Sequence, residues 1–128
     1  MNTTSRNRGR ERGQGLVEFA LTLPIFVMLF ISVFDLSRAI LVSNILAGAA
    51  RDGARFGTIE PTNTSGIIAT AMGRVFAVNP GEVTVAVTCS PICTYGNDLT
   101  VKTTYPFKPV TPFIPQVTLF GISTMSIE

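Results

Sequence analysis

The sequence predicts an α+β chain: a long N-terminal transmembrane helix that extends into a small C-terminal domain with one helix and an antiparallel sheet. Three observations indicate this class. Residues 19–34 contain no charged side chain, helical spacing of apolar and small residues continues to about Gly57, and short alternating segments separated by Gly, Pro and Asn follow. We therefore divide the chain into a basic cytoplasmic leader (1–13), a long helix (14–57) and a small extracytoplasmic α+β domain (58–128).

The leader carries a charge that the rest of the chain lacks. Residues 1–13 contain four Arg and one Glu, a formal charge of +3, whereas the remaining residues contain six Lys or Arg and seven Asp or Glu, which gives −1. A basic flank directly before an apolar run favours the cytoplasmic side of a membrane. We therefore expect a cytoplasmic N-terminus and an exported C-terminal domain, and we do not expect the basic residues to bind nucleic acid.

An apolar segment of membrane length begins directly after the leader. Residues 15–34, within the helix expected over 14–57, would span about 30 Å at about 1.5 Å per residue. The Asp35-Leu36-Ser37-Arg38 sequence that follows is not a small-x-small cleavage site, so we expect the segment to remain as a single-pass anchor in the inner (cytoplasmic) membrane. A buried helix of a soluble protein is the competing interpretation.

Small residues recur along the part of the long helix beyond the membrane. Ala49, Gly53 and Gly57 are spaced by four and therefore share one helix face. Such a face allows close approach of a packing partner. Two partners remain open: the C-terminal domain of the same chain, or a neighbouring subunit.

A second helix is predicted after the Glu60-Pro61 break. It runs from Ser65 to about Val78, with Thr64 or Ser65 as its N-cap. Its apolar face is formed by Ile67, Ile68, Ala71, Val75 and Phe76. Asn79-Pro80-Gly81 ends it.

Three strands are predicted after this helix. Alternation indicates strands over 83–88, 99–105 and 118–127, with a turn at 96–98 between the first two. Prolines at 106, 109, 112 and 115 predict an extended link between the last two strands. With Phe107 and Phe113, this link is either a contact for a binding partner or a rigid edge of the domain.

The two cysteines, Cys89 and Cys93, fall in the predicted exported part of the chain. An oxidising compartment would favour a disulfide between them, and Pro91 can turn the short loop that separates them. Free thiols and a metal site are the alternatives. The sequence contains no His and no second Cys pair to complete a zinc site, so we expect no metal.

Several kinds of chemistry have no candidate residues. Without His, no His-based triad or His general base can form. There is no phosphate-binding glycine loop and no series of basic and aromatic residues for single-stranded nucleic acid. The acids beyond the long helix are far apart in the sequence and lie near predicted turns or an end: Glu60, Glu82, Asp98 and Glu128. We therefore expect a structural or assembly protein, not an enzyme, with no cofactor and no small-molecule substrate.

Glu18 stands alone near the start of the apolar run, where an ionised side chain is costly. If the chain is cut after Gly13, Gln14 becomes the N-terminus and Glu18 the fifth residue. The new ammonium group would then lie about one helical turn from Glu18, or near Glu18 of a neighbouring subunit, and the pair could set the register between subunits. Cleavage after Gly15 would put Glu18 third. Alternatively, Glu18 is an interfacial carboxylate without a partner.

These residues resemble the prepilin class and, more narrowly, the TadE-like family of tight-adherence pilus proteins. The resemblance lies in Arg12-Gly13-Gln14-Gly15-Leu16-Val17-Glu18-Phe19-Ala20-Leu21, in the segment through Pro24, and in Ala49-Ala50-Arg51-Asp52-Gly53-Ala54-Arg55. It is specific over residues 12–57. Phe19 stands where processed members of the family often have Tyr, which is a mild departure.

The resemblance implies a minor pilin-like protein, or pseudopilin, of a Tad-type type IV pilus and secretion apparatus. It also implies that a membrane aspartyl prepilin peptidase cuts after Gly13, and that the partners are other pilin-like subunits and Tad assembly proteins. The alternative is an uncleaved, single-pass, membrane-anchored binding module. The two differ in whether residues 1–13 are removed and in whether Glu18 is required.

Overall fold

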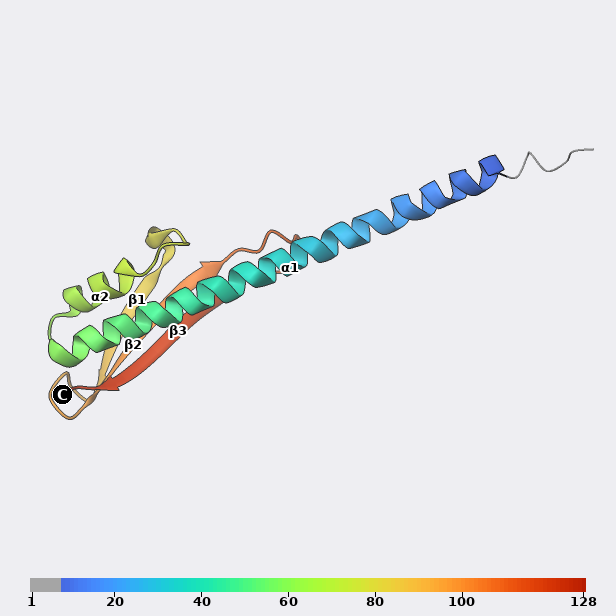
Figure 1. The fold of residues 1–128 in the computed structure, drawn as a ribbon. Coiled ribbons are helices and arrows are strands. Elements are labelled where there is room, and N and C mark those ends of the chain that lie inside the picture. The colour runs from blue at the N-terminus through green and yellow to red at the C-terminus, as the bar shows by residue number, and fades with distance from the viewer. Residues whose placement is uncertain (1–7) are drawn as a thin grey trace, which may run out of the picture.

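The computed structural model describes residues 8–128, with side chains described from Gly13 onward, so most of the predicted leader lies outside the described residues. Its first element is one long helix, α1 (Arg8–Ile59, 52 residues). A helix of this length extends for about 78 Å. The N-terminal half of α1 projects from the molecule as a rod, and its C-terminal half packs on the remaining elements (Figure 1).

The second helix, α2 (Thr64–Gly73), is shorter than the sequence predicts. Asn63, not Thr64 or Ser65, is the N-cap, and its side-chain oxygen accepts the Gly66 N–H at 3.0 Å. At the other end the helix stops at Gly73, because glycine is a weak helix former. The side chain of the C-cap residue, Arg74, forms an ion pair with Asp52 of α1 at 2.8 Å.

This earlier end changes the predicted apolar face of α2. Ile67 and Ala71 are buried within the helix, and Val75 is buried just after it. Phe76 was expected on the same face but is exposed. The expectation was wrong because residues beyond Gly73 no longer follow the helical period.

The three strands form one antiparallel sheet in the order β1-β2-β3. They are β1 (Thr84–Ser90), β2 (Asp98–Phe107) and β3 (Val117–Ser126), and a short 3-10 turn, η1 (Pro80–Glu82), precedes them. The observed architecture confirms the predicted α+β class, with a second helix and an antiparallel sheet after the long helix.

Pro106 belongs to β2 and not to the link that follows, which corrects the predicted strand end. It pairs with Thr118 of β3, whereas the pairing of β2 with β1 already stops at Thr104 opposite Thr84. The last residues of β2 therefore have a strand neighbour on one side only. A proline is tolerated there because the open side needs no N–H donor.

Both helices cover the same face of the sheet, α1 over β2 and β3 and α2 over β1. The core between them is built from small residues of α1, such as Ala50 and Ala54, and larger ones of β2, such as Leu99 and Val101. Alternate side chains of each strand point toward this core, as the period of a strand requires. The C-terminal half of α1 is thus an integral part of the domain, and its N-terminal half is not.

Candidate assembly site

The residues at the predicted processing site lie on the free end of α1. Gly13, Gln14 and Glu18 are all helical and exposed. Gln14 and Glu18 are four residues apart and therefore lie one turn apart on the same face. A Cβ placed on Gly13 or Gly15 would meet nothing within 4 Å outside the helix itself. This end of the chain is therefore open to a protease or to another subunit.

The Gly13–Gln14 bond lies within helical backbone, since α1 begins at Arg8. A protease that binds an extended substrate would first have to unwind the helix there. Gly13 and Gly15 each weaken a helix by about 1 kcal/mol relative to Ala. Local unwinding at this position is therefore less costly than it would be with Ala at both positions.

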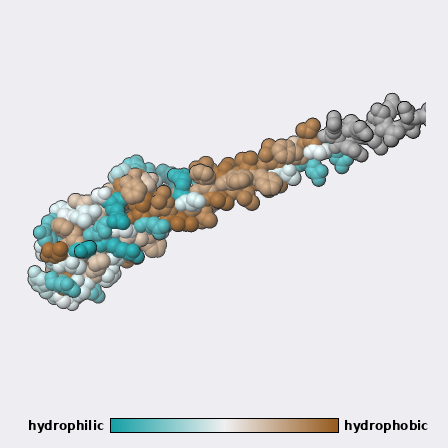
Figure 2. Space-filling model, in the orientation of Figure 1, coloured by the Kyte–Doolittle hydropathy of each residue, from teal (hydrophilic) through white to brown (hydrophobic). Residues whose placement is uncertain are grey.

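One helix of the described part of the chain is long and apolar enough to cross a membrane, and it lies near the N-terminus. No residue of its most apolar window is buried inside the protein. On the face shown in Figure 2, the projecting rod is covered mostly by apolar residues. A helix that is apolar on all sides and has no protein around it is typical of a membrane span, not of a soluble core.

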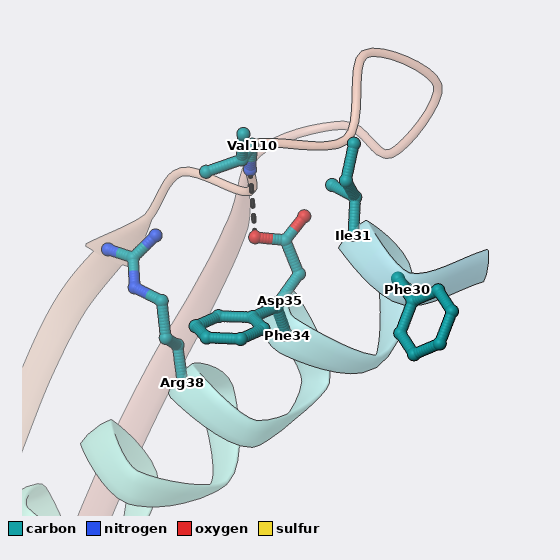
Figure 3. A pocket seen from close by; sticks show the side chains of 6 residues that line it. All are labelled: Phe30, Ile31, Phe34, Asp35, Arg38 and Val110. Carbon is teal, nitrogen blue, oxygen red and sulfur yellow. Dashed lines mark hydrogen bonds between the residues drawn. The ribbon is translucent and has the colours of Figure 1, made fainter. Parts of the chain in front are cut away.

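Asp35 follows this apolar run directly and fixes the link between β2 and β3 to α1. The Val110 N–H donates to Asp35 Oδ1 at 2.9 Å, and the Thr111 N–H donates to Oδ2 at 2.7 Å. The Thr111 hydroxyl also donates to Oδ2, at 2.6 Å. Asp35 is only 4% exposed, and Figure 3 shows its carboxylate directed from α1 toward Val110.

Hydrogen bonding sets the charge state of this carboxylate. The side-chain hydrogen bond from Thr111 is the largest influence that lowers the pKa of Asp35, followed by the backbone N–H of Val110. Desolvation by burial opposes them, while the Thr111 N–H and the charge of Arg38 add to the lowering. Donors that bond the charged form stabilise it, so Asp35 is an anionic anchor at neutral pH.

The small-residue stripe of α1 lies against the C-terminal domain of the same chain. A Cβ on Gly53 would come within 3.1 Å of Ala71 Cβ in α2, and one on Gly57 within 2.8 Å of a Leu99 methyl in β2. Ala49 is fully buried next to Ala71. The stripe thus provides the close α1–α2 and α1–β2 contacts within one subunit.

Cys89 and Cys93 form a disulfide, with their Cα atoms 5.1 Å apart. The bridge joins the end of β1 to the loop that follows, at the end of the domain farthest from the apolar rod. Within the part of the chain that the structure describes, no group of three or more His, Cys, Asp or Glu residues could hold a metal ion.

The predicted site residues are therefore spread along the molecule in three places. Gly13, Gln14 and Glu18 lie at the free end of α1, the stripe lies in the domain, and the disulfide lies beyond it. Asp35 was not singled out from the sequence. The only local signal was its position as the first charge after a long uncharged run, but its partners are 75 and 76 residues away.

The family model described as TadE-like protein matches residues 13–55. The match confirms the resemblance expected from the sequence, and it covers about a third of the chain. It begins at Gly13 and ends within the small-residue stripe. Comparisons with curated proteins and with solved structures found no match. The family match and the candidate membrane helix together support a membrane protein associated with Tad pili.

Proposed function

We propose that this chain is a minor pilin-like protein, or pseudopilin, that takes part in assembly of Tad-type type IV pili or the related secretion apparatus. The observation that carries the proposal is the family match over residues 13–55. It starts at the glycine after which cleavage is expected and includes Glu18 on the exposed end of α1. The N-terminus lies in the cytoplasm, residues 15–34 cross the inner membrane, and the C-terminal domain lies outside the cytoplasm.

In this proposal a prepilin peptidase cuts after Gly13, and the Gln14 ammonium group pairs with Glu18 of the same or a neighbouring subunit. Such a pair in a membrane environment is strongly favoured over either charge alone, because neither charge has water to replace its partner. It would align each new subunit with those already assembled. The partners are other pilin-like subunits and Tad assembly proteins, which exposed apolar residues of α1 would contact.

The rival candidate is an uncleaved membrane-anchored binding module. The helical backbone at the Gly13–Gln14 bond favours it, because proteases generally bind extended chains. Of its two expected contact residues, Phe113 is exposed and Phe107 is buried, so Phe113 alone remains accessible to a partner.

One measurement separates the pseudopilin from the binding module. The intact mass and N-terminal sequence of the protein are determined from its own host, with and without the prepilin peptidase. We expect a chain that begins at Gln14 only when the peptidase is present. Gly13→Leu should block processing, whereas the matched variant Gly15→Leu should not. A chain that retains residues 1–13 in a host with active peptidase would contradict the pseudopilin proposal and favour the binding module.

A further inference from the structure

The link between β2 and β3 (residues 108–116) lies beside the apolar half of α1. It leaves the end of the sheet and extends along α1 in the direction of the N-terminus (Figures 1 and 3). Val110 of this link lines a groove of about 360 Å³ together with residues of α1. Phe30, Ile31 and Phe34 form its apolar part, and Asp35 and Arg38 lie at its domain end. Because Phe30 and Ile31 belong to the uncharged run, the β2–β3 link lies level with the last turns of the predicted membrane span.

The outward side of the β2–β3 link is apolar. Val110 and Ile114 are exposed, and Phe113 is 75% exposed. Val110 lines the same groove as Phe30 and Phe34, so it joins the link to the exposed apolar surface of α1. A contiguous apolar surface of this kind marks an interaction site, and here it adjoins the surface expected to contact lipid.

The backbone of the link is also suited to a medium that offers few hydrogen bonds. Pro109, Pro112 and Pro115 carry no N–H group. The N–H groups of Val110 and Thr111 donate to Asp35, and that of Ile114 donates to the Thr111 carbonyl at 3.3 Å. In lipid, every unpaired backbone donor is costly, and most donors of this link are absent or already paired.

Two basic side chains lie at the domain end of the link: Lys108 is its first residue, and Arg38 lies one helical turn beyond Phe34 in α1. Arg38 and Lys108 are both exposed, and the Arg38 guanidinium lies 5.6 Å from the centre of the Phe107 ring. Long basic side chains at the end of a membrane helix reach the level of the phosphate groups. From the membrane span toward the domain, the apolar residues of the link therefore come first and the two cations second. Acyl chains and headgroups follow each other in the same order in a leaflet.

We infer that the β2–β3 link inserts into the membrane leaflet on the side of the C-terminal domain, with acyl chains in the groove beside Phe30 and Val110. Asp35 is the positioning residue that holds the link at this depth. The domain would then rest on the bilayer in one orientation, fixed at α1 and at the link. The inference depends on the proposed membrane crossing of residues 15–34.

The sequence contains no Trp, so one introduced Trp reports on one position. We would reconstitute the full-length protein at low density in phosphatidylcholine vesicles, with or without bromine on the acyl chains, which quenches Trp within the hydrocarbon. Phe113→Trp tests the link. Tyr95→Trp is the matched control, since Tyr95 is 76% exposed and lies near the disulfide at the far end of the domain. Phe26→Trp reports on the membrane span.

We expect strong quenching for Phe26→Trp, clear quenching with a blue-shifted emission for Phe113→Trp, and neither for Tyr95→Trp. If Phe26→Trp is quenched and Phe113→Trp behaves like Tyr95→Trp, the link is covered by water or by a second protein, and the inference fails while the membrane crossing stands. If Phe26→Trp is not quenched, the proposed crossing fails and the inference fails with it.

The positioning role of Asp35 is tested in the Phe113→Trp background. Asp35→Asn removes the charge and keeps the shape, and Thr111→Val removes only the hydroxyl donor. We expect quenching of the Trp introduced in the link to decrease in Asp35→Asn and to decrease less in Thr111→Val, with quenching of Phe26→Trp unchanged by either substitution. Equal quenching of the link Trp with and without the Asp35 charge would overturn the positioning role.

Discussion

Gly121 of β3 lies directly against the backbone of Leu46 in α1. A Cβ on Gly121 would come within about 2.5 Å of the Leu46 carbonyl oxygen and the Ala47 nitrogen. The same carbonyl accepts the hydroxyl of Thr103, which is fully buried, at 2.9 Å. Backbone atoms cannot rotate away as a side chain can. α1 can therefore approach the sheet this closely only because residue 121 has no side chain.

Gly121→Ala should destabilise the C-terminal domain by about 1–3 kcal/mol, because α1 and β3 must separate to admit the methyl group. Thermal or denaturant unfolding of the full-length protein in detergent measures the change. Gly73→Ala is the control, since a Cβ there meets nothing within 4 Å, and it should be neutral or stabilise by up to about 1 kcal/mol. Equal midpoints for the two variants would contradict the close approach.

The small-residue stripe gives a second packing prediction. Gly53→Val should destabilise the domain by about 1–3 kcal/mol, because its side chain would press on Ala71 and on the Ile67 carbonyl. Arg55→Val is the matched control: it carries the same branched side chain in the same helix at an exposed position. Unfolding of both variants in the isolated, unassembled protein is the measurement. If Gly53→Val unfolds like Arg55→Val but impairs assembly, the stripe serves contacts between subunits instead.

Asp35 predicts a specific pH dependence of the β2–β3 link. Because the pKa of Asp35 is lowered in the folded protein, its bonds to Val110 and Thr111 are fully present above the ordinary carboxyl pKa of about 3.9. These hydrogen bonds are lost only as the pH falls through the pKa of Asp35 in the folded protein, which is lower than the ordinary value. We expect constant protection of the two amides against hydrogen exchange from neutral pH down to about 3.9.

Asp35→Asn tests whether the charge of Asp35 protects these two amides. At neutral pH it should increase exchange of the Val110 and Thr111 amides by about tenfold or more, since hydrogen bonds to a charged group are stronger than neutral ones. The Ile127 amide, which donates to the Asn97 carbonyl at 2.9 Å far from Asp35, should keep its rate. If the Val110 amide of the wild-type protein loses protection well above the ordinary carboxyl pKa, the charged form of Asp35 is not what protects it.

A structural feature could be predicted from the sequence when the residues that determine it lie close together along the chain. The long helix, its apolar surface and the antiparallel sheet depend on periodicity within the segment, and they were predicted. The end of α2 was predicted too late, because the apolar spacing continues to Val75 and Phe76 although the helix ends at Gly73. Pro106 was assigned to the link because local propensity cannot reveal that one side of β2 has no neighbour at that point.

The same distinction applies to the candidate site. Gly13, Gln14 and Glu18 form a continuous motif that can be read locally, and the family match includes them. The contacts of Asp35 and of Gly121 join residues more than seventy positions apart along the chain. Nothing in the neighbouring sequence of either residue indicates its partner, so only the folded structure brings them together.

Glu18 gives the decisive test of subunit registration. Glu18→Ala should reduce incorporation into pili or assembly complexes by about tenfold or more. A tenfold change corresponds to about 1.4 kcal/mol, and removing one member of a desolvated charge pair costs at least that much. Quantitative blotting of sheared pili and of the membrane fraction measures it, and the amount in the membrane should not change. Glu18→Gln should fail similarly, because it keeps the size but not the charge. Thr22→Ala is the control one turn further along, where the hydroxyl only bonds to backbone carbonyls of its own helix. Normal incorporation of Glu18→Gln would show that charge pairing does not align the subunits.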